Sequence, residues 1–500
     1  MQFPVRQKVV AMKSCVFALI LLGAPTAANA DKIAQPKYNV LFIISDDLTA
    51  TALSCYGNTV CQTPNIDAIA AKGTRFTRAF CQGTYCGPSR ASMLSGYYPH
   101  ATGVLGYKSP RPQIGDRATW PQHFKNNGYY AARVSKIYHM GVPGGVLLGG
   151  DGRDHNKYNG ADDEASWTER FNSPGPEWKA PGDGETLEGN PDGKKPVVGG
   201  NTFVVVEADG DDMVHSDGMT AAKAVQLIDT HKDEAFWLGV GFVRPHVPFV
   251  APKSYYPPFL PYEKMVLPEK VPGDWDDIPK PGINYKTSLN MKMDVRRQKK
   301  AMGGYYASVA FMDAQVGKVM AALKKAGIED KTIVIFTSDH GYHLGEHDFW
   351  AKVSLRDESA GVPLIISVPG SKPAVCHSLV ELLDLYPTIS QLCGLEVPGR
   401  LQGRDISPML DDPSHSVRDA AFSAAPARKG FLLREDKWAY IQYREDASGG
   451  IELFDTEKDP QQFTNLAELA EYAEVVAGFR EQLAARLTAV RNNDLDITYR

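Results

Sequence analysis

The chain lacks several features that would place it in other classes of protein. Beyond its first thirty residues it has no apolar run long enough for a membrane-spanning helix. It has no excess of basic residues, with 54 Lys and Arg against 59 Asp and Glu and a formal net charge of -5, so no nucleic-acid partner is expected. Its cysteines show no paired CxxC spacing of the kind that holds zinc, and no internal repeat is evident.

The bulk composition is that of an ordinary globular protein. Hydrophobic residues make up 43% of the 500 residues and charged residues 23%. A chain of this length can bury a large core, and it predicts either several domains or one large α/β domain with an appendage. Because the chain is slightly acidic overall, an anionic substrate would have to be held by a local basic pocket.

The first thirty residues have the pattern of a secretory signal peptide. Arg6, Lys8 and Lys13 precede the apolar residues 15–23, and small residues then lead to an Ala-Asn-Ala sequence that ends at Ala30. The alternative, an uncleaved anchor, is disfavoured because the apolar run is short for a bilayer. We therefore expect cleavage after Ala30, no membrane span in the mature chain, and a secreted or periplasmic location.

Removal of this segment, which contains Cys15, leaves an even number of cysteines. They are Cys55, Cys61, Cys81, Cys86, Cys376 and Cys393. An oxidising compartment permits disulfides, and the sequence separations allow a Cys55–Cys61 and a Cys376–Cys393 bridge. The sequence alone leaves the pairing open.

Short apolar segments alternate with helical patterns along the first four hundred residues. The expected strands are residues 40–45, 236–242, 332–337 and 362–368. One helix is expected to begin at Thr63-Pro64 and to end near Gly73, and a long amphipathic helix is expected over 300–325. Buried strands that alternate with helices predict an α/β fold, with a large, mostly parallel sheet covered on both faces.

Two other regions have a different character. Residues 141–217 are rich in Gly, Asp, Asn and Pro and predict a long surface insertion, and residues 257–281 form a second, proline-rich excursion. From about residue 420 the pattern changes to short strands at 430–433, 437–443 and 452–455, followed by a helix over 466–491. We therefore expect a large N-terminal α/β domain over 31–415 and a smaller α+β subdomain over 416–500.

Acidic residues follow two of the expected strands. Asp46 and Asp47 come directly after the first, and Asp339 and His340 follow the strand at 332–337. Adjacent carboxylates repel one another unless a cation neutralises them, and the carboxyl ends of parallel strands meet at one sheet edge. The alternative is that each is an ordinary turn or capping pair. Together they favour a divalent cation with oxygen ligands, calcium or magnesium.

The most specific stretch is residues 84–96, TYCGPSRASMLSG. It places Cys86 at the start of a predicted helix with Arg90 one helical turn later. A lone cysteine is usually a small buried hydrophobe. This pattern, Cys-x-Pro-x-Arg followed by an apolar pair and a glycine, resembles the signature of the sulfatases, in which the cysteine is oxidised to formylglycine.

Further segments follow in the order typical of type I sulfatases, so the resemblance covers nearly the whole mature chain. They are NVLFIISDD (39–47), TPNID (63–67), SKIYH (135–139), RPHVPF (244–249), TSDHG (337–341), LGEH (344–347), WAK (350–352), ELFD (452–455), KDP (458–460) and NL (465–466). Within the family the chain most resembles the iduronate-2-sulfatase branch. The resemblance implies the alkaline-phosphatase-like sulfatase fold and sulfuric ester hydrolysis on a sulfated carbohydrate, a glycosaminoglycan or other polysaccharide fragment.

The same resemblance implies a cofactor and a modification. One calcium ion would be held by Asp46, Asp47, Asp339 and His340, with the formylglycine made from Cys86 completing the site. A formylglycine-generating maturase is then a required partner. The hydrated aldehyde would attack sulfur, and the metal would polarise a sulfate oxygen and acidify the hydrate.

The resemblance also implies roles for five further side chains. Arg90 would stabilise the hydrate, Lys136 would contact sulfate, and Lys352 would donate to sulfate or to the bridging oxygen. His139 would be the base that collapses the sulfated intermediate, and His246 would assist the leaving oxygen. Without the family context, Arg90 would be a surface arginine, Lys136 and His139 a solvated pair, and His246 a turn residue.

Other histidines and two competing functions complete the predictions. His343 and His347 are expected to be structural, whereas His100 and Tyr342 could contact substrate. Hydrolysis of phosphate or phosphonate esters on the same fold is one alternative, because both ester types share a tetrahedral oxyanion geometry. A catalytically silent carbohydrate-binding protein is the other, although that alternative predicts an eroded motif. The insertion at 141–217 departs from the family pattern and leaves the sugar open.

Overall fold

The computed structural model of the protein describes residues 38–143, 145–146, 159–189, 202–495 and 497. The predicted signal peptide, residues 1–30, lies outside these ranges. No helix within them combines the length and the apolar character needed to cross a bilayer.

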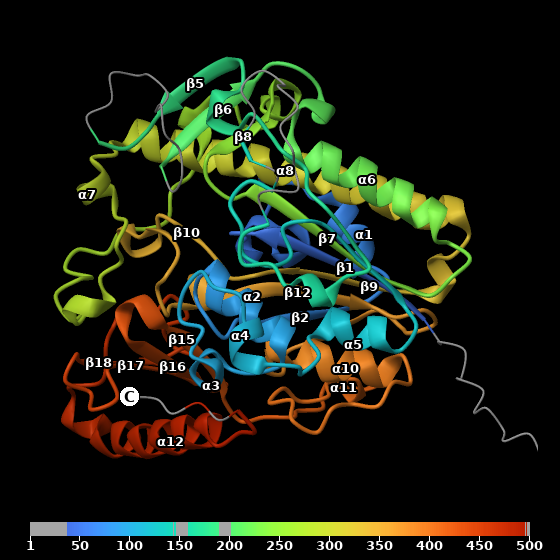
Figure 1. Ribbon diagram of the computed structural model, residues 1–500. Helices are drawn as coiled ribbons and strands as arrows, with labels where there is room; N and C mark the ends of the chain where they lie inside the picture. Colours follow the sequence, from blue (N-terminus) through green and yellow to red (C-terminus); the bar gives the residue numbers. More distant parts are fainter. Residues whose placement is uncertain (1–37, 144, 147–158, 190–201, 496, 498–500) are drawn as a thin grey trace, which may run out of the picture. The chain divides into compact units, whose positions relative to one another are not determined.

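Nine of the described strands form one large sheet (Figure 1). Its order is β13 (Ala374–Cys376), β2 (Thr74–Phe80), β12 (Gly361–Ser367), β9 (Thr332–Ser338), β1 (Asn39–Asp46), β7 (Phe236–Pro245), β3 (Tyr130–Ser135) and β4 (Glu169–Phe171), with β14 (Val380–Glu381) also paired to β2. The central strand β1 runs parallel to both β7 and β9. Only β12 runs antiparallel to its neighbours among these described pairs. The predicted mixed, mostly parallel sheet is confirmed.

Helices cover both faces of this sheet, which explains why its central strands are continuously apolar. Leu41 and Ile43 of β1 face the core beneath α1 (Pro64–Ala70), α6 (Ser216–Thr230) and α8 (Val295–Ala326). Phe42 faces the opposite core, which is covered by α2 (Cys86–Ser95), α5 (Trp120–Asn126) and α10 (Leu385–Leu392). The predicted long helix is α8, which begins five residues earlier than expected because Asp294 caps it.

The insertion at 141–217 is more regular than the sequence predicts. β4 adds to the edge of the large sheet. β5 (Gly182–Thr186) and β6 (Val204–Ala208) pair with each other and with β8 (Phe249–Pro252) in a three-stranded sheet. The expectation of a surface loop was wrong for these segments because β6 is apolar and buried, and β5 is held by pairing with it.

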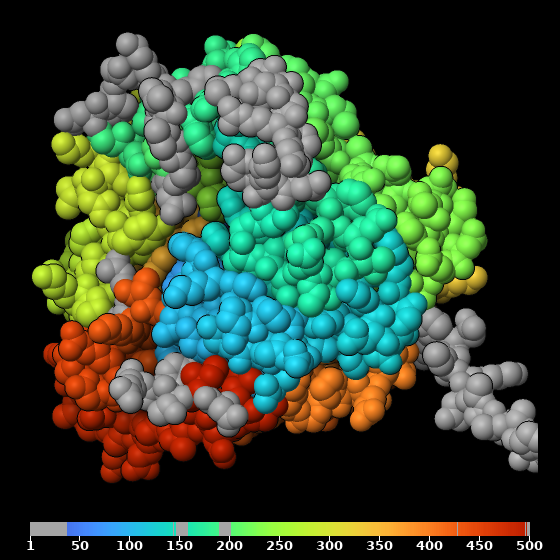
Figure 2. Space-filling model, viewed as in Figure 1, coloured from blue at the N-terminus to red at the C-terminus, as the bar shows by residue number. Residues whose placement is uncertain are grey.

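The C-terminal part forms a four-stranded antiparallel sheet, which contains the three predicted strands and one, β15, that was not predicted. Its strands are β15 (Ala421–Ala425), β16 (Gly430–Arg434), β17 (Trp438–Tyr443) and β18 (Ile451–Asp455). The last helix, α12 (Ala473–Arg491), begins later than expected. Figure 2 shows this part, orange to red, against the light-blue segment that contains α3 (Pro99–Thr102).

One hydrophobic core joins this sheet to the preceding residues. Tyr97 and Leu383 pack in the same cluster as Phe422 and Phe479. All described residues belong to a single compact unit, 36–500. The boundary at 415/416 therefore stays a prediction about sequence regions.

The thiols form no bridge at the suggested positions. Cys55 and Cys61 are free, and Cys376 is free, so no disulfide joins it to Cys393.

Candidate active site

Four neighbouring strands of the large sheet end at one place, and each is followed by a polar side chain. These are Asp46 and Asp47 at the end of β1, Asp339 and His340 after β9, His246 after β7, and Lys136 after β3. All six residues except His246 are buried, and the imidazole of His246 is 16% exposed. The backbone of Asp47 has a φ of 64°, a conformation that aspartate tolerates, and this turns the chain sharply at the strand end.

Four of these neighbouring groups can hold a metal ion. One atom each from Asp46, Asp47, Cys86 and His340 lies within 4.8 Å of the others, and all four residues are buried. The Oδ2 atom of Asp47 has no hydrogen-bond partner among the described residues. A buried carboxylate oxygen without a hydrogen-bond partner is costly unless a cation neutralises it, so this group fits a divalent cation, and its two carboxylates are the hard oxygen donors of the set.

Asp339 lies beside this group. Its Oδ2 is 2.8 Å from Nε of Arg90, and its Oδ1 accepts the backbone N–H groups of Asp47 and His340 at 3.2 and 3.1 Å. The distance from Asp339 Oδ2 to His340 Nε2 is 3.6 Å. Asp339 thus orients Asp47 and His340, and both of its carboxylate oxygens already accept hydrogen bonds.

Cys86 is the first residue of α2, whose backbone N–H groups point toward it as the positive end of the helix dipole. Its Sγ lies 3.3 Å from Lys352 Nζ, 3.3 Å from His340 Nε2 and 3.9 Å from Asp47 Oδ1. Gly87 follows because a Cβ there would meet the Gly106 carbonyl oxygen at 2.4 Å. The thiol therefore lies between the carboxylate group and a lysine.

Arg90 lies one turn further along α2 and is fully buried, so it is not a surface residue. Its guanidinium is 3.3 Å from Asp46 Oδ1, and it donates to the carbonyl oxygens of Lys136 and Ile137 at 2.7 and 3.0 Å. With its bond to Asp339, Arg90 fixes three strand ends in one arrangement. It stands behind the carboxylates, and none of the described hydrogen bonds joins its guanidinium to Cys86, although the two groups interact electrostatically.

The charges of the site stabilise one another. Burial raises the pKa of Asp46, but Lys136, His246 and Arg90 outweigh it and hold that pKa well below its ordinary value. Burial raises the pKa of the Cys86 thiol, and Asp46 adds to the effect. The unmodified thiol is therefore protonated at neutral pH and is a poor nucleophile.

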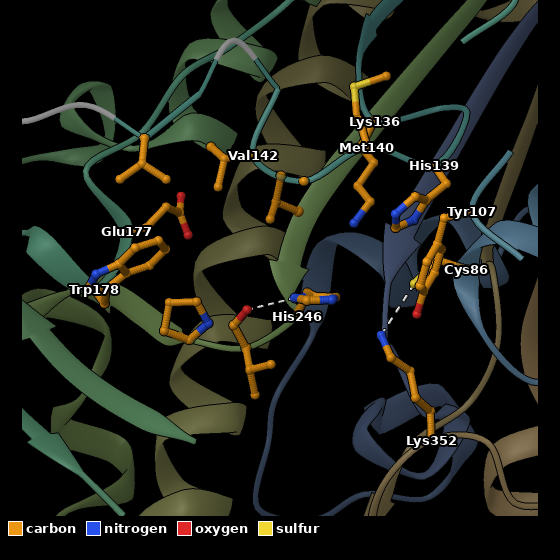
Figure 3. Close-up of a pocket in the computed structure, with 15 residues that line it drawn as sticks. Cys86, Tyr107, Lys136, His139, Met140, Val142, Glu177, Trp178, His246 and Lys352 are labelled. Atoms are coloured by element: carbon orange, nitrogen blue, oxygen red, sulfur yellow. Dashed lines mark hydrogen bonds between the residues drawn. The ribbon is translucent and has the colours of Figure 1, made fainter. Parts of the chain in front are cut away.

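A cavity of about 390 Å³ opens beside Cys86 (Figure 3). Lys136, His139, His246 and Lys352, the predicted catalytic side chains, all line it with Cys86. Lys136 forms an ion pair with Asp46, and Lys352 Nζ lies 2.6 Å from Asp47 Oδ1. Of the predicted catalytic residues, only Arg90 does not line this cavity.

The two histidines of the cavity are neutral at neutral pH. Burial, and then the nearby Lys136, lowers the pKa of His139 to about 2. Burial lowers the pKa of His246 to about 4, although Asp47 opposes the shift. His246 Nε2 is 3.8 Å from Asp47 Oδ2, and its Nδ1 is 2.6 Å from the Val247 carbonyl oxygen. Both imidazoles are in the form that can accept a proton.

Among the residues of the cavity that were not predicted from the sequence, those with an aromatic or charged side chain are Tyr107, Glu177 and Trp178. Tyr107 stands near the cysteine signature without being part of it. Glu177 and Trp178 form an adjacent pair inside the Gly- and Asp-rich insertion, where a tryptophan is unusual and is the one available signal.

The four secondary predictions fall elsewhere. His100 lines a different cavity, where its ring is 5.1 Å from Phe431. Tyr342 is buried against Tyr305, with ring centroids 5.4 Å apart. Neither lines the cavity at Cys86, and their contact with substrate stays a prediction. His343 and His347 also lie outside its lining.

The fold and this arrangement define a hydrolase of the alkaline-phosphatase-like class. Residues 38–395 match the family described as Sulfatase, and residues 345–489 match the one described as N-sulphoglucosamine sulphohydrolase, C-terminal. The protein belongs to the sulfatase family and is a sulfuric ester hydrolase. The resemblance to type I sulfatases is confirmed.

Individual relatives agree with this assignment. Iduronate 2-sulfatase of Homo sapiens is 33% identical over 429 residues, 76% of this chain and 73% of the relative. A sulfatase of Formosa agariphila is 29% identical over 444 residues, 86% and 83% of the two chains. In fold, the chain is similar to the phosphonate monoester hydrolase of Silicibacter pomeroyi, with a TM-score of 0.72 and 21% identity over 90% of this chain and 95% of the other.

Proposed function

We propose that this protein removes sulfate from a sulfated carbohydrate, a glycosaminoglycan or other polysaccharide fragment, by means of a formylglycine made from Cys86 and one bound calcium ion. The observation that carries the proposal is the position of Cys86, at the junction of the buried carboxylate group and a cavity lined by two lysines and two histidines. Similarity to iduronate 2-sulfatases supports a carbohydrate substrate.

Asp46, Asp47 and His340 would hold the calcium ion together with the modified residue 86, with Asp339 beside them. The ion and the hydrated aldehyde together would supply a polarised sulfate oxygen and an oxygen nucleophile. Calcium is favoured over zinc because the partnerless Asp47 Oδ2 and the second carboxylate are hard oxygen donors.

The remaining work is done by side chains of the cavity. Lys352 and Lys136 lie within reach of residue 86 and of the carboxylates, and their charges orient the sulfate and neutralise its oxygens. His139 is the neutral base that takes a proton from residue 86. The Nδ1–H of His246 donates to the Val247 carbonyl oxygen, so Nε2 of the neutral ring carries no proton, and His246 assists the leaving sugar oxygen once Nε2 has taken up a proton. Arg90 keeps Asp46 ionised.

The test requires protein coexpressed with a formylglycine-generating maturase, with the aldehyde at residue 86 verified by peptide mass analysis. Sulfate release is then measured on defined sulfated oligosaccharides and on 4-nitrophenyl sulfate, with Cys86→Ala as the control. Release that depends on Cys86 supports the proposal. Turnover that survives in Cys86→Ala contradicts the mechanism.

Matched phosphate and phosphonate esters in the same assay address the competing function. The solved phosphonate monoester hydrolase with this fold is the reason to include them. If the enzyme hydrolyses those esters faster than sulfate esters, the proposal that its substrate is a sulfate ester is overturned. The absence of any turnover, with the aldehyde present, would favour a silent binding protein.

We also propose that the protein is exported, secreted or periplasmic, on the evidence of the signal-peptide pattern in residues 1–30. N-terminal sequencing of the mature protein from the host tests this, and Asp31 as the first residue is the expected result.

A further inference from the structure

The cavity at Cys86 has two unlike sides. Figure 3 shows Lys136, His139, Cys86 and Lys352 on one side, with Glu177, Trp178 and Val142 across from them and His246 between the two groups. The first side contains the proposed sulfate position. The second side is therefore where the sugar that bears the sulfate would lie.

Positive charge is confined to the first side. Among the described residues that line the cavity, Lys136 and Lys352 are the only lysines or arginines. Lys136 forms an ion pair with Asp46, and Lys352 Nζ lies 2.6 Å from Asp47 Oδ1. Both amines therefore lie at the proposed sulfate position, on the first side of the cavity.

The far side is apolar except for one carboxylate. Val142 and Trp178 lie on this side in Figure 3, and Val146, Val243, Val247 and Pro248 add to the apolar lining of the cavity, whereas Met140 lies beside Lys136. Glu177 lines the same side, and its carboxylate is held by Arg244 in an ion pair whose two side chains are each 2% exposed. The wall thus presents hydrocarbon, an indole ring and a carboxylate whose charge Arg244 already neutralises.

The same ion pair fixes the position of Trp178. The Arg244 guanidinium also donates to the carbonyl oxygens of His246 and Pro248, at 2.8 and 3.0 Å. Glu177 therefore ties the insertion to the loop that carries His246, and the next residue, Trp178, packs beside the small apolar cluster of β6 and β8. Trp178 is a fixed part of the cavity wall.

Resting on the sulfatase function proposed above, we infer that the sulfate-bearing ring taken by this cavity is uncharged, a neutral hexose or N-acetylhexosamine rather than a uronic acid. The C–H face of a pyranose packs against the indole of Trp178 and the valines around it. A uronate carboxylate on this side would lose water without gaining a cation among the described lining residues, because Arg244 is already paired with Glu177. This combination of attraction and exclusion is how a site discriminates between sugars.

The inference is tested with matched 4-methylumbelliferyl glycosides and the aldehyde-containing enzyme. The neutral set carries sulfated galactose, N-acetylgalactosamine or N-acetylglucosamine, and the comparison is the 2-sulfated iduronide. We expect kcat/KM on the best neutral sugar to exceed that on the uronide by about a hundredfold or more, as expected for an unpaired buried charge. A uronide turned over as well as the best neutral sugar, or 4-nitrophenyl sulfate turned over with no neutral sugar, overturns the inference. Failure on every sulfate ester instead removes the proposed function itself.

Two variants locate the discrimination. Trp178→Ala should raise KM for the neutral sugar by about tenfold, and the matched control Trp438→Ala, on the C-terminal sheet, should leave KM unchanged. Val142→Arg places a cation on the far side and should raise the ratio of uronide to neutral-sugar kcat/KM by about tenfold. An unchanged ratio in Val142→Arg together with an unchanged KM in Trp178→Ala would show that this wall does not contact the sugar.

Discussion

The imidazole of His139 stacks on the phenol ring of Tyr107, with centroids 4.1 Å apart and an angle of 26° between the planes. Nδ1 of His139 is buried and has no hydrogen-bond partner among the described residues. The other face of this arrangement is supported by Tyr85, whose ring meets Tyr107 edge-on at 5.5 Å. Aromatic packing therefore holds the His139 ring in place. In many sites a hydrogen bond to Nδ1 would do this instead.

Replacement of Tyr107 should lower kcat through the position of His139. Tyr107→Leu removes the stacked ring, and we expect kcat on a sulfate ester to fall by about tenfold to a hundredfold because a small misplacement of a base is costly. Tyr107→Phe keeps the ring and should stay within about twofold of the parent protein. Steady-state kinetics on both variants is the measurement. An equal loss in both would assign the effect to the hydroxyl group and contradict the stacking role.

Removal of Arg90 should destabilise the fold. Arg90→Ala leaves Asp46 and Asp339 buried without their shared cation, and loss of one partner from a buried ion pair costs about 3–5 kcal/mol. Arg90→Lys keeps the positive charge but not the forked geometry of the guanidinium. Its free energy of unfolding should therefore lie between those of the parent protein and Arg90→Ala. Urea unfolding in the presence of a chelator measures the difference.

Arg78→Ala is the matched control for that experiment. Arg78 pairs at 3.0 Å with Asp436, whose side chain is 75% exposed, so its loss should cost less than about 1 kcal/mol. Equal midpoints for Arg90→Ala and Arg78→Ala would show that the buried network does not support the fold.

The central strands could be predicted from the sequence because burial on both faces leaves them no polar positions. β1, β7 and β9 read as continuous apolar runs, and the convergence of the acidic ends of β1 and β9 followed from the geometry of parallel sheets. β3 could not be predicted in the same way. It is short and contains Arg133, which is buried only because Asp162, 29 residues later, pairs with it at 2.7 Å.

In the candidate site, too, residues that are close in sequence could be placed together, whereas contacts between distant segments could not be predicted. Cys86 and Arg90 belong to one helix, so local spacing places them together. Glu177 and Trp178 reach the cavity only through the ion pair with Arg244, a contact between segments 67 residues apart. No local pattern predicts that contact. The ion pair between Arg90 and Asp339 could not be predicted for the same reason.

Calcium should stabilise the protein through Asp47. Its partnerless buried Oδ2 is the observation that points to a cation, and binding at a hundredfold excess over Kd would add about 2.7 kcal/mol to the free energy of unfolding. We expect the thermal midpoint to rise with added calcium and to fall with a chelator. Asp47→Asn should abolish the rise, whereas Asp436→Asn, at an exposed carboxylate, should retain it. Scanning calorimetry on the unmodified protein measures this without any turnover, and a rise that persists in Asp47→Asn would place the ion elsewhere.

His215 should make the fold sensitive to acid. It is 2% exposed, its Nε2 has no hydrogen-bond partner among the described residues, and burial followed by Arg244 lowers its pKa to about 4. The unfolded chain, with a histidine pKa of about 6.5, binds this proton first as the pH falls. The stability that the neutral imidazole contributes is thus complete above about pH 6.5 and is lost between there and pH 4, a loss of up to about 3 kcal/mol.

In His215→Gln the difference in unfolding free energy between pH 7 and pH 4.5 should be smaller than in the parent protein, by about 2 kcal/mol. His415→Gln, at an exposed histidine, should leave that difference unchanged. Equal pH dependence in the parent protein and in His215→Gln would show that the imidazole is already charged in the folded state.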